Sequence, residues 1–582
     1  MRWVRGAGRA AGAVLWLIVL LPVLALGPAA VFDCGPGGDA RLTPFPAALA
    51  LLDPYTWLCV RNSLGVALVT TLGSAVLGMS GARVAMSFRF WGRPILGALA
   101  AALLAVPPAF NAIGFQGWFG GGGVARLPAW PVDPGWLGWF WSAIGPGSAL
   151  VGLATAASLR EVDPVWYEAA RLAGARRRDA WRWLVSPVVW PDAARALVAV
   201  FTLTLLDPGP ALVLGLRRTL GYQIVEAAWA FAEPGQSGRA VVLTLLGVAL
   251  AWVGRELIRV GSGSPLEGAS NPSEPEPRPT PLSTTRGLLL AGLCSVPLVV
   301  LWVPALALFT TAFDLPGRSG SSGSLHFFRD LAADPLVRRV LGNSLAIGLA
   351  VMGSELILAR LAVALISATS GRLAWIVTWP GLVPPLAIGI GALSLPSLLA
   401  TLAALLDPGG ASGGVGLTHG LADALRSVSA WLDPGQTPGV LLVLGVAVAR
   451  LFITSRSALE RRHRLRPELV DAAVVVGATP GQARRKLSGR WFLGVSPAAA
   501  VVSLALAMTH PTPALVLAPT AETRPLGPAI LLLARSEDRG LVHASALASV
   551  AVAINLAALA AALPGRRGLV RSWLRLGDLD HR

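Results

Sequence analysis

The side chains that most often carry chemistry are few and scattered in this chain. The six histidines form no His-Glu-x-x-His or similar cluster, and Cys34, Cys59 and Cys294 lack metal-ligand spacing. A phosphate-binding loop needs Gly-Lys followed by Ser or Thr, whereas the one lysine, Lys486, is followed by Leu487. We therefore expect no catalytic residue, no metal site and no cofactor in the chain. If ATP drives this protein, a separate subunit binds the nucleotide.

One polar segment is suited to binding rather than to reaction. Pro164 suits the first turn of a helix, Gly174 suits its end, and Pro187 permits a sharp change of chain direction. Two short helices joined at a glycine elbow would form a compact knob, on which a carboxylate beside two alanines can meet donors on a protein partner. An ordinary solvated loop is the alternative interpretation. The residues assigned to this contact are Glu168, Ala169, Ala170, Gly174, Leu184 and Pro187.

A weaker copy of the polar segment occurs later in the chain. Its matching residues are Asp471, Ala472, Ala473, Gly477 and Leu487. Asp471 follows Glu168 by 303 positions, and Gly477 follows Gly174 by the same interval. The eight residues 207–214 also recur 303 positions later, at 510–517, with six identities. An internal repeat of this length predicts two related halves.

The composition indicates a polytopic membrane protein. The 582 residues are 54% hydrophobic and only 14% charged, with mean hydropathy +0.64, whereas a soluble domain carries roughly 25% charged residues. The net charge of +17 comes from arginines clustered between apolar runs. This pattern is typical of basic loops retained on the cytoplasmic side, and it argues against nucleic-acid binding.

Apolar runs long enough to cross a bilayer recur along the whole sequence. A spanning helix needs about 20 mainly apolar residues. We therefore predict an all-α fold with about 12 transmembrane helices, in two tandem parallel repeats of about six. The predicted spans are 11–31, 63–87, 94–115, 138–159, 193–216 and 238–258, then 287–313, 341–368, 373–397, 437–456, 493–518 and 540–563. The first is a retained helix or, alternatively, a cleaved signal peptide.

A segment rich in Gly, Ser, Pro and Glu divides the chain. Residues 261–285 cannot bury enough apolar surface to order themselves, so we expect a flexible linker between halves 1–260 and 286–582. Placing both termini in the cytoplasm puts every dense arginine cluster on that side. The loops then assigned to the outer side are 32–60, 116–136, 314–338 and 398–436.

Three ionisable residues fall within or beside predicted spans. Charged groups at bilayer depth are costly and point to function by default. Asp207 and His510 occupy equivalent repeat positions beside a Pro-x-Pro, so they are candidates for a translocation path; solvation at the outer helix end is the alternative. Glu355 is a third candidate. Its alternative is a structural ion pair with another helix, because Arg360 is five positions away rather than three or four.

The polar segments carry a family resemblance. Glu168-Ala169-Ala170, Gly174 and Leu184-x-Ser186-Pro187 resemble the EAA loop of permease subunits of bacterial type I ABC importers, with loops here at 163–191 and 466–490. The duplicated helix starts and proline pairs resemble the fused, two-half permeases of the iron(III) and thiamine uptake type. These repeated elements are Asn62-Ser63-Leu64 with Asn343-Ser344-Leu345, and Val106-Pro107-Pro108 with Val383-Pro384-Pro385.

The resemblance implies a permease of the bacterial cytoplasmic membrane that works by alternating access. It implies two copies of an ATPase subunit on the cytoplasmic loops, where ATP is bound, and an extracytoplasmic solute-binding protein. Iron(III) is the first expected substrate, with thiamine or another small solute as the alternative. Asp471 stands where the family has glutamate, and Gly489-Arg490 replaces the Leu-Pro pair. We therefore expect the second loop to couple more weakly.

Two rival functions differ from this expectation. An ATP-independent secondary transporter or channel predicts ion-coupling residues at the bilayer midplane and needs no partner, but the predicted spans hold few carboxylates. An intramembrane enzyme requires a nucleophile and base at useful spacing or a ligand cluster, and the sequence offers neither.

Overall fold

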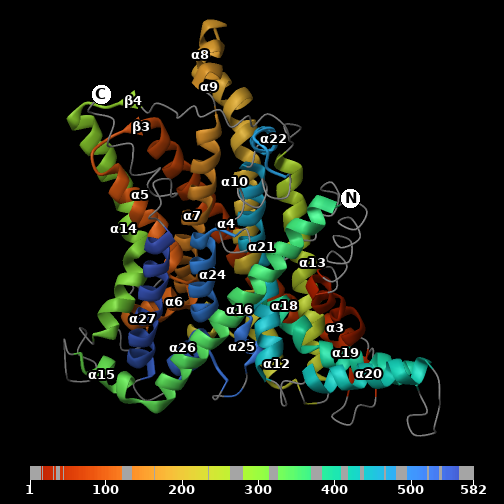
Figure 1. Cartoon of the computed structure of the whole chain (residues 1–582). Helices are drawn as coiled ribbons and strands as arrows, with labels where there is room; N and C mark the ends of the chain where they lie inside the picture. Colours follow the sequence, from red (N-terminus) through yellow and green to blue (C-terminus); the bar gives the residue numbers. More distant parts are fainter. Residues whose placement is uncertain are drawn as a thin grey trace.

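The computed structural model describes residues 15, 18–30, 32–34, 40–42, 45–120, 134–162, 164–231, 233, 235–262, 280–313, 325–368, 383–407, 417–432, 438–464, 467–479, 495–518, 520, 523–536 and 540–562. The described chain is almost wholly helical, and its long helices run side by side in one bundle (Figure 1). Helices α8 and α22 lie at one end of this bundle, and α12, α15 and α20 lie at the other.

The elements of the first half follow in chain order. They are α2 (Leu26–Ala29), β1 (Phe32–Cys34), β2 (Ala40–Leu42), α3 (Phe45–Leu52), α4 (Pro54–Ser87), β3 (Phe88–Arg89), α5 (Arg93–Ala102), the 3₁₀ turn η1 (Leu103–Ala105), α6 (Pro108–Phe119), α7 (Pro134–Glu161), α8 (Pro164–Leu172), α9 (Arg177–Ala180), the π-helical turn η2 (Trp181–Val185), α10 (Ser186–Leu205), α11 (Pro208–Val213), α12 (Leu220–Trp229) and α13 (Gln236–Ser262).

The second half begins at the end of the predicted linker. Its elements are β4 (Thr280–Pro281), α14 (Thr284–Ala312), α15 (His326–Ala333), α16 (Pro335–Ala368), α18 (Pro385–Leu393), α19 (Leu395–Leu406), α20 (Leu417–Leu432), α21 (Pro438–Arg464), α22 (Pro467–Val475), α24 (Pro497–Thr509), α25 (Ala514–Leu517), α26 (Leu526–Ala534) and α27 (Gly540–Ala562).

The polytopic membrane character predicted from hydropathy is confirmed at the level of helix length and composition. Among the described residues, seven helices are long and apolar enough to cross a membrane, or nine if each of two bent pairs is one span. One bent pair corrects the expected straight span 94–115, because the chain turns by 95° between Arg93–Ala105 and Pro108–Phe119. The break falls at Pro107-Pro108, where each proline lacks the N–H that would continue a helix.

Two further expectations about helix limits are corrected. The span expected at 193–216 begins earlier, because the helical path from Arg178 to Val213 includes it, and it contains a break after Leu205, where α11 starts anew at Pro208. The outer loop expected at 398–436 is instead largely helical, because α19 continues to Leu406 and α20 covers 417–432. The described start of the span expected at 373–397 is Pro385, and residues 373–382 lie outside the described chain.

The first helix of each half packs against the other half. The apolar helix Ile18–Ala29 packs with second-half residues of α16, α19 and α21 in one buried cluster. Helix α14 packs against α5, α6 and α7 of the first half. Three tryptophan indoles fasten α14 there, because Trp118 donates to Thr310, Trp141 to the Val300 carbonyl and Trp302 to the Leu99 carbonyl. The two halves therefore share one interior.

The described end of the predicted linker is ordered. Residues 263–279 lie outside the described chain, but Thr280 and Pro281 form β4, which pairs in parallel with β3. The Leu282 N–H also donates to the Arg89 carbonyl at 3.3 Å. The start of the second half is thus attached beside the end of α4, whereas the sequence predicted a flexible segment up to residue 285.

Candidate functional site

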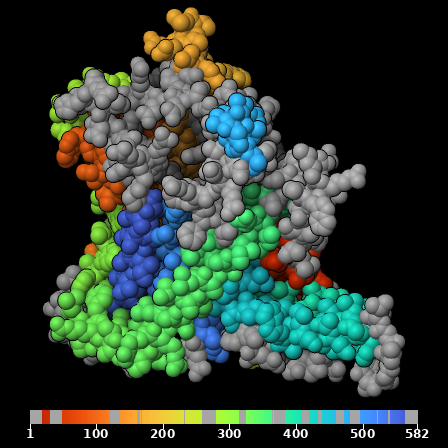
Figure 2. All heavy atoms as spheres, in the orientation of Figure 1, coloured from red at the N-terminus to blue at the C-terminus, as the bar shows by residue number. Residues whose placement is uncertain are grey.

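The first polar segment forms a helix that projects beyond the bundle. Helix α8 starts at Pro164 and stops before Gly174, as predicted, and Figure 2 shows it standing clear of the body of the protein. Glu168 and Ala169 are exposed, and Leu172 is 90% exposed. Val165 and Trp166 are exposed as well. This projection therefore presents apolar side chains together with one carboxylate, a composition typical of a protein interface.

The end of α8 is closed by a Schellman arrangement, in which two backbone N–H groups return to carbonyls of the last turn. Gly174 has φ +82°, its N–H donates to the Arg171 carbonyl at 3.0 Å, and the Ala175 N–H donates to the Ala170 carbonyl at 2.9 Å. Only glycine adopts this left-handed conformation without steric cost. Gly174 thereby fixes the direction in which the chain leaves α8.

The second polar segment repeats this geometry. Helix α22 starts at Pro467 and has nine residues, as α8 does. Gly477 has φ +96°, its N–H donates to the Val474 carbonyl at 2.9 Å, and the Ala478 N–H donates to the Ala473 carbonyl at 3.0 Å. Asp471 and Ala472 are exposed, and Val475 is 87% exposed. Leu487 and Arg490 lie outside the described residues.

The base of the first projection corrects the role expected for Pro187. The chain does not turn sharply there. Instead α9, η2 and α10 form a continuous helical path, and the Ser186 N–H bonds back to the Trp181 carbonyl in a π-turn. A wider turn accommodates the hydrogen bond that proline cannot make. The expected second short helix is therefore the end of a long membrane helix, with Leu184 and Pro187 half-buried.

A contact missed from the sequence links this base to α4. The guanidinium of Arg83 lies 4.0 Å from the ring centroid of Trp181, and Trp181 packs against a cluster that includes Ala82, Met86 and Val185. A cation over an indole face is attracted by the ring quadrupole. The sequence showed that Arg83 stands at the cytoplasmic end of a predicted span. It did not show the partner, because Trp181 lies almost a hundred positions away. Movement of α9 and η2 would thus be transmitted to α4.

No hydrogen bond or ion pair joins Asp207 to His510, the two residues that the predicted repeat aligns. Asp207 caps α11 by accepting from the Gly209 N–H at 3.0 Å. His510 lies beside its own turn, with Nδ1 3.1 Å from the Thr512 carbonyl. Each side chain thus satisfies the backbone that its own Pro-x-Pro break exposes. The helix breaks predicted at these positions are present.

Glu355 lies at a buried junction of three helices. It accepts a hydrogen bond from the hydroxyl of Ser503 on α24, and both side chains are fully buried. Arg450 of α21, also buried, donates to the Ser503 carbonyl at 3.2 Å and to the Leu506 carbonyl, and its charge acts on Glu355. Arg360 is exposed on another side of α16. Arg450 was missed from the sequence, although it stands inside the predicted span 437–456.

The first half has small residues at the corresponding junction. If the predicted repeat is extended at its intervals of 281 and 303 positions, Glu355, Arg450 and Ser503 align with Ser74, Gly147 and Val200. These three also meet, because a Cβ at Gly147 would lie 2.4 Å from the Ser74 hydroxyl and 3.2 Å from Val200. The crossing is thus close-packed in one half and holds buried hydrogen-bonded polar side chains in the other.

The halves also meet near the end of the bundle opposite α8. Arg535 of the second half lies near the Tyr222 and Trp229 rings, at 5.9 and 5.7 Å from their centroids. The Trp229 indole donates to the Leu515 carbonyl at 3.2 Å. These contacts lie beside α25 and the end of α12.

No protein-family model matches this chain, and a comparison with curated proteins finds no significant match.

Proposed function

We propose that this chain is the permease subunit of an ATP-driven importer, and that α8 and α22 are the two elements through which separate ATPase subunits act on it. The observation that carries the proposal is the pairing of these elements. Both are exposed nine-residue helices at one end of the bundle, and both are closed by the same glycine-dependent turn 303 positions apart. Two ordinary solvated loops would have no structural reason to share the same capping turn and the same exposed apolar side chains.

The proposal includes two related halves of about six spans each. Among the described residues, seven span-length helices, two bent pairs and three shorter apolar helices each overlap a predicted span, which supports this part of the proposal. Helices α4 and α16 both have 34 residues, and each starts at a proline that directly follows an aspartate. Ser63 accepts from the Leu220 N–H at 2.9 Å, and its counterpart Ser344 accepts from the Leu526 N–H at 2.7 Å. Equivalent tertiary hydrogen bonds favour duplication over a chance likeness of sequence.

In this mechanism ATP binding and hydrolysis occur on two copies of a partner ATPase, and this chain contributes movement. Closure of the ATPases would displace α8, and the Arg83–Trp181 contact would carry that displacement to α4. Alternating access then opens the path between the halves toward each side in turn. Asp207, His510 and Glu355 stay candidate path residues of this proposal. The proposed substrate is iron(III), with thiamine or another small solute as the alternative. An extracytoplasmic solute-binding protein would deliver it to this permease in the bacterial inner membrane.

The proposal is tested by copurification and by charge reversal. The chain purified in mild detergent from its native host should retain an ATPase subunit, and Glu168→Arg should reduce both retention and substrate uptake. Glu233→Arg is the matched control, because Glu233 is also an exposed glutamate and closely follows α12, which lies at the opposite end of the bundle. Absence of an ATPase from the wild-type preparation, together with normal uptake by Glu168→Arg, would refute the proposal. The ligand found on the copurified binding protein identifies the substrate.

A further inference from the structure

The second half contains a helical hairpin for which the described residues of the first half show no equivalent. The Pro-Pro breaks of the two halves lie 277 positions apart, whereas Glu168 and Asp471 lie 303 apart, so the second half gains residues between them. The gain falls between α18 and α21, where α19 and α20 pack against each other. Figure 2 shows this pair, in the colours of residues 395–432, extending sideways from the body of the protein.

Helix α19 covers only part of the apolar face of α20. Ala422, Leu425 and Leu432 turn toward α19 and are buried or half-buried, and the Ser429 hydroxyl donates to the Pro396 carbonyl at 2.8 Å. A second apolar stripe lies beside this contact at helical spacing, formed by Leu421, Ala424, Val428 and Trp431. Leu421 is 53% exposed, Val428 45% and Trp431 56%. The neighbouring helix adds Leu402 and Leu405, which are also exposed.

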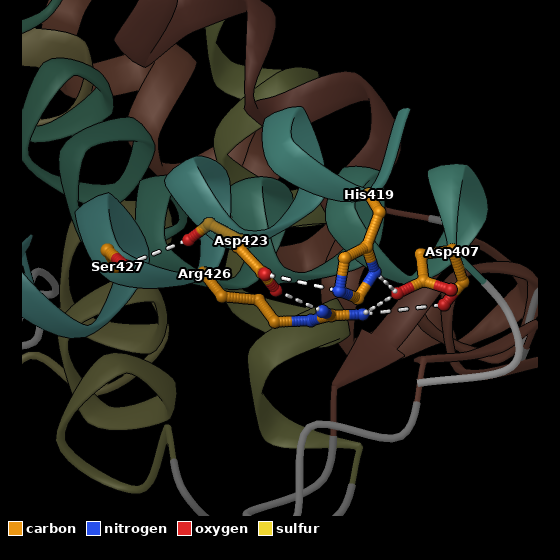
Figure 3. Close-up of polar contacts among 5 residues, drawn as sticks. All are labelled: Asp407, His419, Asp423, Arg426 and Ser427. Carbon is orange, nitrogen blue, oxygen red and sulfur yellow. Dashed lines mark hydrogen bonds and ion pairs between the residues drawn. The ribbon is translucent and has the colours of Figure 1, made fainter. Parts of the chain in front are cut away.

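The opposite face of α20 carries all of its described charge. His419 Nδ1 lies 2.8 Å from Asp407, Arg426 donates to Asp407 at 3.2 Å and to Asp423 at 2.8 Å, and His419 Nε2 lies 3.4 Å from Asp423 (Figure 3). These contacts fasten the end of α19 to the polar face of α20. The network thus gathers the charges on one side of the hairpin and leaves the exposed stripe uncharged.

We propose that the α19–α20 hairpin lies in the membrane interface at the end of the bundle opposite α8, with the Leu421–Trp431 stripe immersed in lipid. A helix with one apolar and one charged face, lying across the spanning helices, is the form that binds in the interface plane. Helix α19 also continues from α18 through a bend of only 41° within a bent membrane pair, so its exposed leucines extend the lipid-facing surface sideways. Trp431 suits the headgroup level, where tryptophan is enriched.

The sideways position decides between lipid and a soluble partner. A protein docked over a path between the halves would cover the bundle axis, where α12, α25 and α26 lie, whereas the hairpin extends beyond the side of the bundle (Figure 1). Its exposed stripe consists of aliphatic and aromatic side chains, and the charged side chains of α20 lie on the opposite face. The hairpin therefore anchors α18, and with it one wall of the second half, to one leaflet.

The experiment measures quenching of a fluorophore on single cysteines in lipid nanodiscs. Cys34, Cys59 and Cys294 are first replaced, and Val428→Cys and Leu421→Cys are labelled with an environment-sensitive dye. Ser427→Cys is the matched control, because Ser427 is exposed, adjacent to Val428 and on the polar face. A covalent probe is needed because the chain has 21 tryptophans, which mask Trp431 emission.

Nitroxide on the upper acyl chain should quench the dye at residues 421 and 428 several times more strongly than at residue 427. A water-soluble nickel chelate should give the reverse order. Equal quenching of all three sites by the chelate would place the stripe in water and overturn the proposal. Protection of residues 421 and 428 from both quenchers would also overturn it, because that result means that protein covers the stripe.

Discussion

Glu355 on α16 accepts a hydrogen bond from Ser503 on α24, although the two residues are 148 positions apart and both lie in the buried interior. The charge of Arg450 on α21 acts on the same carboxylate. Three helices of the second half therefore meet at one polar point in an otherwise apolar environment. Because the counterpart residues Ser74, Gly147 and Val200 are small or apolar, this junction is a difference between the halves.

Removing one charge from this junction should destabilise the protein more than removing both. Arg450→Met removes the buried guanidinium that donates to the Ser503 and Leu506 carbonyls and leaves Glu355 without a neighbouring positive charge; hydrogen bonds from a charged group contribute about 1.5–3 kcal/mol. The double variant Arg450→Met/Glu355→Met should recover most of that loss, because similar volumes of apolar side chain fill the site. Thermal unfolding in nanodiscs measures both. Equal stability of the wild type and Arg450→Met would contradict a stabilising role of Arg450 at this junction.

Ser63 in the first half and Ser344 in the second should contribute equally to the stability of the protein. Alanine at either position leaves a buried leucine N–H, of Leu220 or Leu526, without its acceptor. An unsatisfied buried donor costs about 1–3 kcal/mol. Ser74→Ala is the matched control, because that hydroxyl is buried without a hydrogen-bond partner. Chemical unfolding should therefore separate the first two variants from the third, and a loss for Ser74→Ala of similar size would argue against the assignment.

Gly174→Ala and Gly477→Ala should disturb the two projecting elements without creating any clash. Nothing lies within 4 Å of a Cβ at either position, so the effect comes from the positive φ alone. A non-glycine residue there costs about 1 kcal/mol. Gly65→Ala, in the middle of α4 and equally free of neighbours, should instead stabilise by about 0.5–1 kcal/mol. Hydrogen exchange of the α8 and α22 amides reports the local effect, and unchanged exchange would contradict it.

Arg83 should matter through its position above Trp181 rather than through its charge alone. Arg83→Gln removes the cation, whereas Arg83→Lys retains it but loses the planar stacking group. We expect both to weaken the response of uptake to ATP, with lysine the milder, and to leave retention of the ATPase unchanged. Loss of retention would show that Arg83 contacts the partner directly. Identical uptake by the wild type and Arg83→Gln would remove the contact from the mechanism.

The hairpin network should lose strength in acid. The hydrogen bond from His419, followed by that from Arg426, lowers the pKa of the Asp407 carboxyl. Because the folded-state pKa is lowered, ionised Asp407 stabilises the hairpin above the usual value of about 4, and this contribution is lost as pH falls through the lowered pKa. Hydrogen exchange of α20, corrected for intrinsic rates, should therefore separate the wild type from Asp407→Asn at neutral pH. The two should converge only in acid, once the pH lies below the lowered pKa of Asp407.

The sequence by itself determined the features that depend on local chemistry. Hydropathy identified a polytopic helical protein, proline and glycine located the ends of α8 and the stop before Gly477, and the recurrence at 303 positions linked α22 to α8. These inferences succeed because helix ends depend on residues within one turn, and because membrane helices must satisfy their own backbone whatever surrounds them. The same local rules predicted the helix breaks after Asp207 and before the Ala514 helix.

Only the tertiary structure decided which helices meet and which way they turn. Arg450 reaches Ser503 and Arg83 reaches Trp181 because helices distant in sequence cross at those points. The 95° bend at Pro107, the exchange of first helices and the folding of 395–432 into a hairpin likewise depend on packing between elements. The spacing of apolar residues predicts how wide the apolar face of a helix is. It does not predict which other helix packs against that face.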